Sequence, residues 1–294
     1  MIGSGVVMEP AWLDRSAYPF EHRYMDVGAG RMHYVDEGQG EPVLFVHGTP
    51  TWSFEYRHLV KALSPQMRCI APDLVGFGLS GRPSSFAYTP EAHAHALAEF
   101  VDRLGLERFT LVVHDFGGPV GLPLALDGVG RVSRLVIMNT WMWPDEEMQR
   151  AGRLMGGSIG RLLYRYANAS LRLIMPRAYG DRKRLTPEIH RQYLEPFRNR
   201  NDRVLVLHAL AKSLLGSQEF YADSWRRANR LAGRPALIVW GMKDFAFGPR
   251  HLARWEQLLP ASRVLKLADA GHWPHEEAPE EVAGAIRALS LEPA

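Results

Sequence analysis

The stretch Val112-Val113-His114-Asp115-Phe116-Gly117-Gly118 decides the fold. An apolar strand runs directly into two polar residues, and two glycines follow shortly before a helical pattern begins. This is the strand–turn–helix arrangement of a nucleophile elbow, usually written Gly-x-Ser-x-Gly, in which small residues permit a sharp turn. Asp115 occupies the nucleophile position, which excludes a serine mechanism there. The alternative is that Asp115 only caps the helix that follows.

Short apolar runs alternate with helical patterns on both sides of this motif. Such runs, separated by helices, indicate a parallel sheet that is covered on both faces. Residues 24–27 and 31–35 indicate a hairpin that adds antiparallel strands at one edge. The expected strands of the parallel sheet are residues 43–46, 68–74, 109–113, 134–138, 236–240 and 263–267. The expected helices are residues 53–63, 90–104, 119–126, 251–259 and 279–289.

The stretch from residue 141 to residue 229 breaks this alternation. It contains no good strand and is rich in Arg, Leu, Tyr and Met at helical spacing. We therefore expect a helical cap over residues 141–229, inserted into a core formed by residues 1–140 and 230–294. Such an insertion would lie over the carboxyl ends of the strands, where ligands bind in open α/β sheets.

Two further polar residues follow expected strands in the chain order that a nucleophile elbow requires, which is nucleophile, acid, histidine. Asp244 follows the strand at residues 236–240, and His272 follows the last strand, directly after a glycine. We predict that His272 acts as the base and that Asp244 orients its imidazole. Asn139 follows the other strand at which related enzymes carry the acid, and its neutral side chain favours Asp244. His275 is a nearby competitor that we expect at the surface or in a supporting position.

The segment His47-Gly48-Thr49-Pro50 closes one strand and precedes a helix. The backbone N–H of Thr49 can point into the site from this loop, and the N–H of Phe116 can join it from the elbow. Two such donors make an oxyanion hole. The alternative is an ordinary β–α loop.

The composition is that of a globular protein with a full core. The chain has 294 residues, of which 46% are hydrophobic and 23% are charged, and its formal net charge is +3. The basic clusters at residues 182–184 and 198–203 accompany no nucleic-acid-binding motif, so we interpret them as solvated helix faces. Cys69 is the single cysteine, which excludes a disulfide within the chain, and the apolar run around it predicts burial.

No segment has the pattern of a signal peptide or the ~20 consecutive apolar residues of a membrane helix. We expect a soluble, cytoplasmic protein that is a monomer or a small homo-oligomer. Its expected partner is a small apolar substrate, and we expect neither a nucleic acid nor a membrane as a partner.

Together these segments resemble the haloalkane dehalogenase and epoxide hydrolase branch of the α/β-hydrolase superfamily, over nearly the whole chain. The loop Asp73-Leu74-Val75-Gly76-Phe77-Gly78-Leu79-Ser80 is typical of that branch. The segments at residues 47–54 and 241–244 are especially similar to haloalkane dehalogenases. The resemblance implies an α/β-hydrolase fold with an inserted helical cap, an alkyl-enzyme ester on Asp115, and no metal or other cofactor.

Two departures from the dehalogenase pattern concern the leaving group. Dehalogenases usually carry Trp directly after the nucleophile, where its indole N–H holds the halide, and here Phe116 has no side-chain donor. They usually carry Asn or Glu after the His-Gly pair, and here the residue is Thr49. The Thr49 hydroxyl or a cap tryptophan would have to substitute. The candidates in the cap are Trp141, Trp143 and Trp225, and we expect Trp52, Asn139, Trp141 and Trp273 to bind substrate.

The leading hypothesis is hydrolytic dehalogenation of haloalkanes to alcohols and halide. Epoxide hydrolysis is the main alternative, because the cap contains five tyrosines that could supply its acid, namely Tyr164, Tyr166, Tyr179, Tyr193 and Tyr221. Hydrolysis of another strained or activated ester would use the same machinery. A ligand-binding protein without turnover is the alternative from another class, and the departures at the halide site keep it open.

Overall fold

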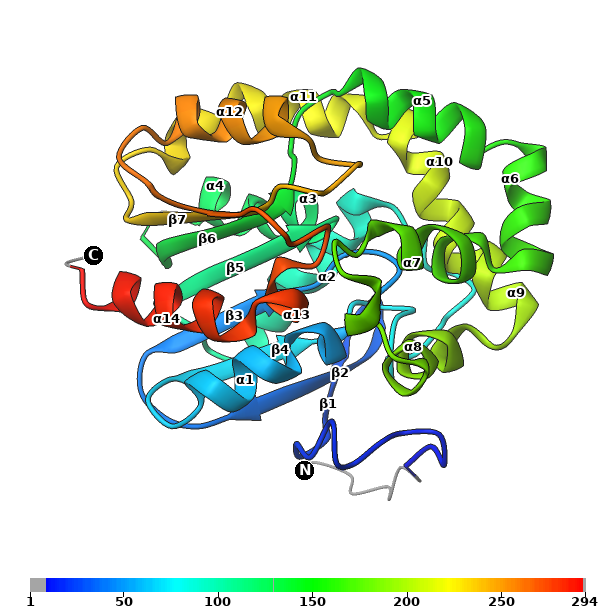
Figure 1. Ribbon diagram of the computed structural model, residues 1–294, viewed down its shortest axis with the longest axis horizontal. Coiled ribbons are helices and arrows are strands. Elements are labelled where there is room, and N and C mark those ends of the chain that lie inside the picture. The colour runs from blue at the N-terminus through cyan, green and yellow to red at the C-terminus, as the bar shows by residue number, and fades with distance from the viewer. Residues whose placement is uncertain (1–8, 129, 293–294) are drawn as a thin grey trace.

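A computed structural model describes residues 9–128 and 130–292 and contains an eight-stranded sheet (Figure 1). Its strand order is β1-β2-β4-β3-β5-β6-β7-β8. The pairs β1–β2 and β2–β4 are antiparallel, whereas the other neighbouring pairs are parallel. The mostly parallel sheet and the edge hairpin are therefore confirmed. The strands are β1 (Arg23–Val27), β2 (Gly30–Glu37), β3 (Pro42–Val46), β4 (Arg68–Pro72), β5 (Phe109–Asp115), β6 (Val132–Thr140), β7 (Ala236–Gly241) and β8 (Arg263–Leu267).

The burial of the strands explains why the sequence predicted them. Every residue of the central strands β5 and β6 is buried, as continuous apolar runs predict for strands covered on both faces. Strand β8 lies at one edge of the sheet, and only its last residue, Leu267, is buried. Cys69 in β4 is completely buried, as expected.

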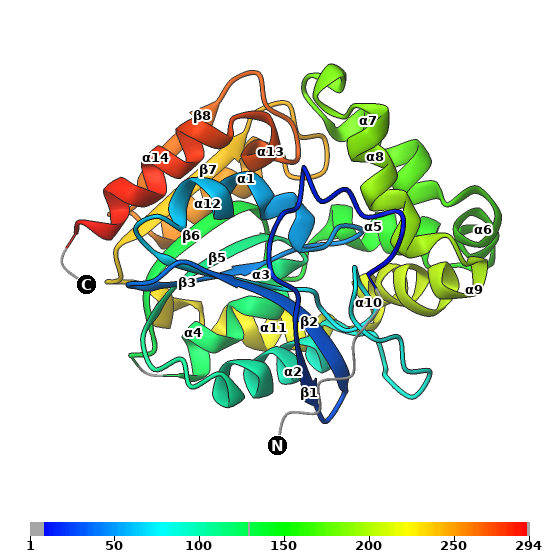
Figure 2. The same cartoon turned by 90° about the horizontal axis from the view of Figure 1, so that it is seen from below.

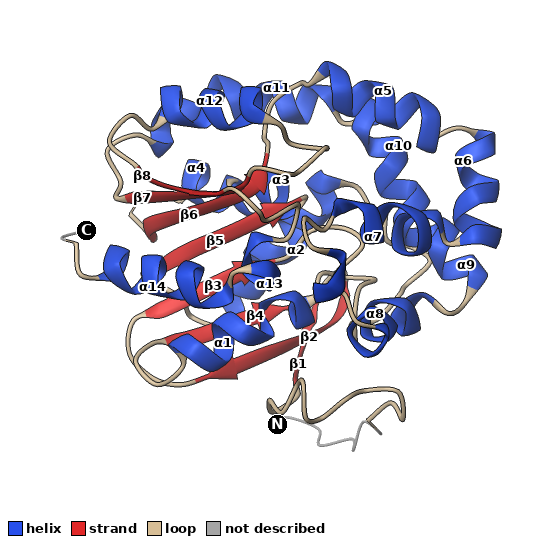
Figure 3. Cartoon of the chain, in the orientation of Figure 1, coloured by secondary structure: helices blue, strands red, loops and turns tan. Residues whose placement is uncertain are grey.

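Helices cover both faces of the sheet (Figures 2 and 3). One face carries α1 (Arg57–Leu63), α13 (Pro274–Glu277) and α14 (Pro279–Ser290), which pack on one another. The other face carries α2 (Pro90–Arg103), α3 (Gly117–Gly121) and α4 (Pro123–Asp127). Helix α12 (Pro249–Leu258) packs on β7.

Three expected boundaries were wrong for local reasons. The helix expected over residues 53–63 divides into a 3-10 turn, η1 (Ser53–Tyr56), and α1. The helix expected over residues 119–126 begins earlier and divides before Pro123, which opens α4 because proline suits the first position of a helix. The strand expected over residues 68–74 ends at Pro72, since the next side chain, Asp73, turns inward to accept the backbone N–H of Ser53 at 2.9 Å.

The described chain between β6 and β7 forms helical elements and no strand. They are α5 (Glu146–Met155), α6 (Ser158–Leu162), η2 (Leu163–Ala167), η3 (Ser170–Ile174), α7 (Met175–Ala178), η4 (Arg182–Arg184), α8 (Pro187–Leu194), η5 (Glu195–Phe197), α9 (Arg200–Asp202), η6 (Arg203–His208), α10 (Ala209–Gly216), α11 (Gln218–Arg226) and η7 (Ala228–Leu231). Those from α5 to α10 lie beyond the arrowheads of β5 and β6, whereas α11 returns toward α12 and η7 packs on α4 (Figures 1 and 3). The division into a core and a cap at residues 141–229 stays a prediction. Among the described helices, none combines the length and the apolar character that a membrane crossing needs.

The turn after β5 depends on the absence of a side chain at Gly117. Asp115 has a φ of +48°, a left-handed conformation that non-glycine residues rarely adopt. The sharp turn brings the next helix against β3, so that a Cβ on Gly117 would overlap the carbonyl oxygen of Val46. Because that oxygen belongs to a central strand, it cannot move without disturbing the sheet.

We predict that Gly117→Ala lowers the free energy of unfolding by about 1–3 kcal/mol, the usual cost of overpacking. Gly284→Ala is the matched control, since a Cβ at this position in α14 meets no atom within 4 Å. It should stabilise the protein by roughly 0.5–1 kcal/mol, because alanine favours helix over glycine. Urea unfolding of both variants measures the difference. Equal effects would contradict the close approach at the elbow.

Candidate active site

Asp115 lies at the end of β5, and both of its carboxylate oxygens have a defined neighbour. The backbone N–H of Thr49 donates to Oδ1 at 2.8 Å. Nε2 of His272 lies 3.5 Å from Oδ2. Asp115 is 8% exposed, and it lines the central cavity. One oxygen is therefore held by the loop that was expected to form an oxyanion hole, and the other faces the imidazole.

His272 is held from its other side by Asp244. Its Nδ1 lies 2.8 Å from Oδ2 of Asp244, and the ring of Phe247 stacks on the imidazole with a centroid distance of 5.6 Å. The second oxygen of Asp244 accepts the backbone N–H of Ala246 at 2.7 Å. The structure thus brings together the three residues that the sequence singled out, in the order carboxylate, imidazole, carboxylate.

Asn139, which was expected to bind substrate, lies outside the cavity lining and contacts the acid instead. Its amide donates to Oδ2 of Asp244 at 2.9 Å, and its carbonyl oxygen accepts the backbone N–H of Gly241 at 2.8 Å. These bonds join the ends of β6 and β7. Asn139 therefore orients Asp244 by donating a hydrogen bond to its carboxylate, and an amide has no acidic proton that would neutralise that carboxylate.

The two carboxylates control the charge of the imidazole. Burial alone would lower the pKa of His272. The charge of Asp244, the contacts with Asp115 and Asp244, and the charge of Asp115 raise this pKa to about 10. Burial likewise raises the pKa of Asp244, but the charge and hydrogen bond of His272 hold it below its usual value. The two carboxylates therefore favour the protonated form of His272.

The cavity above Asp115 has a volume of about 210 Å³, and most of its lining is apolar. Tyr164 contributes a hydroxyl that has no hydrogen-bond partner among the described residues, and its pKa is raised by burial and by the charge of Asp115. The lining consists of Thr49, Pro50, Asp115, Phe116, Trp141, Met148, Ala151, Met155, Tyr164, Ser170, Ile174, Met175, Ala178, Leu207, Ala211, Leu214, Phe245, Ala246, Phe247, His272 and Trp273. Such a cavity suits a small apolar molecule.

The expected aromatic residues divide into two groups. Phe116, Trp141 and Trp273 line the cavity. The indole nitrogens of Trp141 and Trp273 are buried and lack partners within the described chain, and in this conformation neither is reached by solvent. Trp52, also expected to bind substrate, lies outside this lining: its indole N–H donates to the carbonyl of Gln192 at 3.0 Å and its ring stacks on Phe54.

Two of the expected halide donors and one expected competitor also lie elsewhere. Trp143 and Trp225 contact each other edge to face, and neither belongs to the cavity lining. His275 is completely buried against Tyr56, so the surface position that the sequence suggested is excluded. Of the five cap tyrosines, Tyr164 alone lines the cavity.

Two groups of acidic and histidine side chains lie close enough together to hold a metal ion within the described ranges. In the first, Asp145 and Glu147 both pair with Arg250 at 2.9 Å, so a guanidinium already supplies the positive charge. The second consists of Glu55, His114 and His275, behind the cavity. None of these six residues lines the cavity, and Glu55 was missed by the sequence analysis.

Comparison with known proteins agrees with this architecture. Residues 41–279 match the family model described as the alpha/beta hydrolase fold. The chain therefore belongs to the α/β-hydrolase fold family, and the expected fold class is confirmed. Within this family its relatives include haloalkane dehalogenases, so the expected resemblance is also confirmed.

Two curated relatives cover nearly the whole chain. Haloalkane dehalogenase 2 of Mycobacterium tuberculosis is 38% identical over 277 residues, which are 93% of this chain and 96% of the relative. A cis-3-alkyl-4-alkyloxetan-2-one decarboxylase of Shewanella oneidensis is 34% identical over 285 residues, 93% of this chain and 89% of the relative. Among solved structures, haloalkane dehalogenase DbeA from Bradyrhizobium elkani superposes with a TM-score of 0.78 at 25% identity, covering 92% of this chain and 98% of that chain.

We predict that neutralising Asp115 lowers the pKa of His272. In Asp115→Asn the amide keeps the shape of the carboxylate but removes one of the two charges that hold the imidazolium. Nitrogen NMR of the imidazole should then give a pKa below the value of about 10 expected for the unchanged protein. Asp145→Asn is the matched control, because it removes a buried carboxylate beside a different histidine, His251. An unchanged pKa of His272 in Asp115→Asn would refute the electrostatic coupling.

Proposed function

We propose that the protein is a hydrolase that forms an alkyl-enzyme ester on Asp115 and that its substrates are small haloalkanes. The observation that carries this proposal is a carboxylate at the elbow, with Oδ1 bound by the Thr49 N–H and Oδ2 facing the cavity and His272. A carboxylate in this position can act as a covalent nucleophile on saturated carbon. The similarity to haloalkane dehalogenase 2 supports the choice of substrate.

In the first step Oδ2 of Asp115 attacks the carbon that carries the halogen. A carbon–oxygen bond forms, the carbon–halogen bond breaks, and its electron pair leaves with the halide. No proton is needed, because halide is a sufficient leaving group. The apolar lining favours this step, since it excludes water that would solvate the carboxylate.

The first step prepares the base for the second. The ester of Asp115 is neutral, so one of the charges that raise the pKa of His272 disappears. The imidazolium then releases its proton to the solvent, which is the proton that accompanies the halide, and the neutral imidazole removes a proton from the water that attacks the ester carbonyl. Oδ1 becomes the oxyanion and keeps the hydrogen bond from Thr49 N–H. As this intermediate collapses, the departing alkoxide takes the proton from His272 and leaves as the alcohol. The new carboxyl group returns its own proton to His272, which restores the carboxylate and the imidazolium.

The leaving-group side of the cavity differs from the usual dehalogenase pattern. Phe116 supplies no donor, and the indole nitrogens of Trp141 and Trp273 are enclosed. Thr49, Ser170 and Tyr164 bring hydroxyls to the lining. Of these we propose that the Tyr164 hydroxyl, whose pKa is raised by burial and by the charge of Asp115, stabilises the departing anion. Epoxide hydrolysis is less favoured, because the resemblance leads us to expect two tyrosine donors and the lining offers one.

A second candidate function is the opening of strained cyclic esters. The similarity to an oxetan-2-one decarboxylase favours it, as does the missing indole after the nucleophile. Attack of Asp115 on the saturated ring carbon would release the ring's own carboxylate, which stays attached to the substrate. Such a leaving group would need no halide-binding indole. The carbon–carbon bond to this carboxylate would then break as carbon dioxide leaves, an alkene would form, and the electron pair of the ester bond would return to Asp115.

We predict that His272→Phe forms the ester but cannot hydrolyse it. Incubation with a terminal bromoalkane should release about one equivalent of bromide and increase the mass of the intact protein by the alkyl group. Asp115→Asn is the control and should gain no mass, because it lacks the nucleophile. Normal multiple turnover by His272→Phe would remove His272 from the reaction.

The unchanged protein, tested in parallel, distinguishes the substrate classes. Haloalkanes should yield halide, epoxides a diol, and oxetan-2-ones carbon dioxide. Halide release alone supports the leading proposal. Release of carbon dioxide alone would indicate that Asp115 acts on strained esters. No product from any substrate would favour a ligand-binding protein without turnover.

A further inference from the structure

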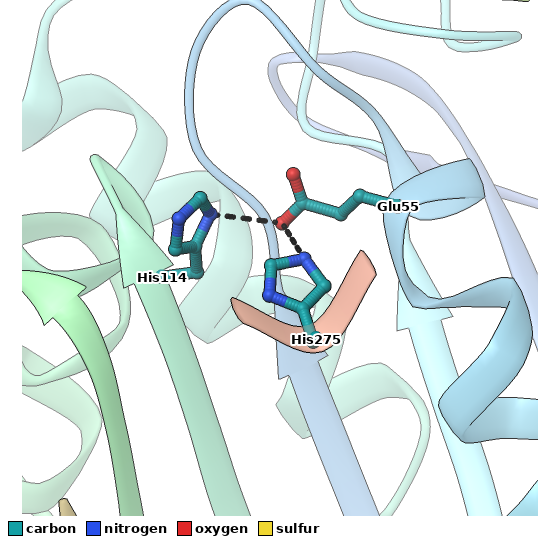
Figure 4. A group of neighbouring side chains, drawn as sticks. All are labelled: Glu55, His114 and His275. Atoms are coloured by element: carbon teal, nitrogen blue, oxygen red, sulfur yellow. Dashed lines mark ion pairs between the residues drawn. The ribbon is translucent and has the colours of Figure 1, made fainter. Parts of the chain in front are cut away.

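Three titratable side chains lie together beneath the cavity, where the reaction described above does not use them. Glu55, His114 and His275 are completely buried, and they point toward one another in Figure 4. Nδ1 of His114 lies 3.3 Å from Oε1 of Glu55, and Nε2 of His275 lies 3.7 Å from the same oxygen. The hydroxyl of Thr51 donates to the other carboxylate oxygen. A carboxylate this deeply buried requires a compensating positive charge.

Each member of the cluster lies on a different element next to the active site, Glu55 on η1, His114 on β5 and His275 on α13. Glu55 follows the loop whose Thr49 N–H binds Asp115, and His114 is the residue directly before Asp115. His275 is three residues after His272. In addition, the Nε2 of His114 lies 2.7 Å from the backbone carbonyl of His272. The cluster therefore connects the oxyanion loop, the nucleophile and the base from behind.

The hydrogen-bond geometry determines where the positive charge lies. A carbonyl oxygen can only accept, so Nε2 of His114 must carry a proton. If Nδ1 carried none, its lone pair would face the carboxylate of Glu55 across 3.3 Å. A proton on Nδ1 as well would remove this repulsion and turn the contact into an ion pair, which the geometry therefore favours. His275 then stays neutral, because burial lowers its pKa well below the usual value.

The carboxylate behaves as the partner of such a cation. Burial raises the pKa of Glu55, but the charge of His114 and its contact at 3.3 Å, together with the two other histidines nearby, lower this pKa to about 2. Glu55 is thus ionised throughout the neutral range. One imidazolium and one carboxylate leave the buried cluster without net charge.

A metal ion fits the same cluster less well. A structural zinc site is closed by four protein ligands, and a catalytic site keeps an open position for water. The three donors here are completely buried, and the described residues provide no fourth member of the group. Moreover, the distal Nδ1 of His275 has no partner, whereas a metal-bound histidine usually donates its second N–H.

We propose that Glu55 and His114 are positioning residues, forming an ion pair that holds the His272 loop at the correct distance from the Asp115 ester. This inference rests on the proposed function. The ion pair touches neither the substrate nor the cavity, and it acts through the carbonyl of His272. Hydrolysis of the ester depends on it more than alkylation does, because only hydrolysis requires His272 to activate a water.

The kinetic test uses two replacements of Glu55. Glu55→Leu removes the partner that holds the His114 ring against the carbonyl of His272. Ester hydrolysis should then slow roughly 10-fold to 100-fold, since small displacements of a reacting group have effects of this size. The alkylation burst should keep its rate. Glu55→Gln should recover most of the hydrolysis rate, because its amide can donate to a neutral His114 and preserve the link. His93→Leu is the control, since His93 is equally buried but lies outside the site and has no hydrogen-bond partner among the described residues.

Equal slowing of both steps, or equal slowing in His93→Leu, would overturn the positioning role. So would normal hydrolysis in Glu55→Leu. Nitrogen NMR of the unchanged protein at neutral pH tests the charge separately, needs no substrate and does not require any variant to fold. Two protonated nitrogens on His114 are expected, and an unprotonated Nδ1 would overturn the ion pair even if the proposed substrates are wrong. Metal analysis should find no bound ion. One equivalent of zinc in the unchanged protein that is lost in Glu55→Leu would show that the cluster is a metal site and would overturn the ion pair.

Discussion

An imidazole held between two carboxylates is the interaction on which the rest of the site depends. Asp244 contacts His272 at 2.8 Å and Asp115 lies at 3.5 Å, so the first partner is fixed while the second remains available for reaction. The asymmetry has an architectural origin. Asp244 is anchored by Asn139 between two parallel strands, whereas Asp115 stands on a strained turn above the sheet. The parallel sheet supplies both positions, because its strands end at the same edge.

Burial of these charges beside an apolar cavity would be costly if they were unbalanced. The protein offsets this cost by pairing. The imidazolium of His272 lies between its two carboxylates, and beneath it the proposed pair of Glu55 and His114 carries no net charge. The neighbouring histidines His272 and His114 therefore each have their own carboxylate partners, Asp244 and Asp115 for His272 and Glu55 for His114. The polar floor is rigid and fully enclosed, while the cavity above it remains apolar enough to admit small organic substrates.

The sequence predicted the features that depend on local patterns. The strands, the elbow and the chain order of Asp115, Asp244 and His272 follow from short apolar runs and the polar residues that end them. Features that depend on tertiary packing could not be predicted. The orientation of Trp52 is set by a carbonyl in the distant segment at Gln192. Tyr164 lines the cavity because of where the cap elements pack, which no local pattern distinguishes from the other cap tyrosines. Glu55 was missed although an acid within an apolar run is a signal of a buried partner.

The most direct measurement is a single turnover in heavy-oxygen water, followed by mass spectrometry of the peptide that contains Asp115. If Asp115 forms an ester and water attacks its carbonyl, one heavy oxygen remains in the Asp115 side chain and the alcohol carries the original carboxylate oxygen. Label in Asp115 is the predicted result. Label only in the alcohol would contradict the covalent intermediate, because water would then have attacked the substrate directly.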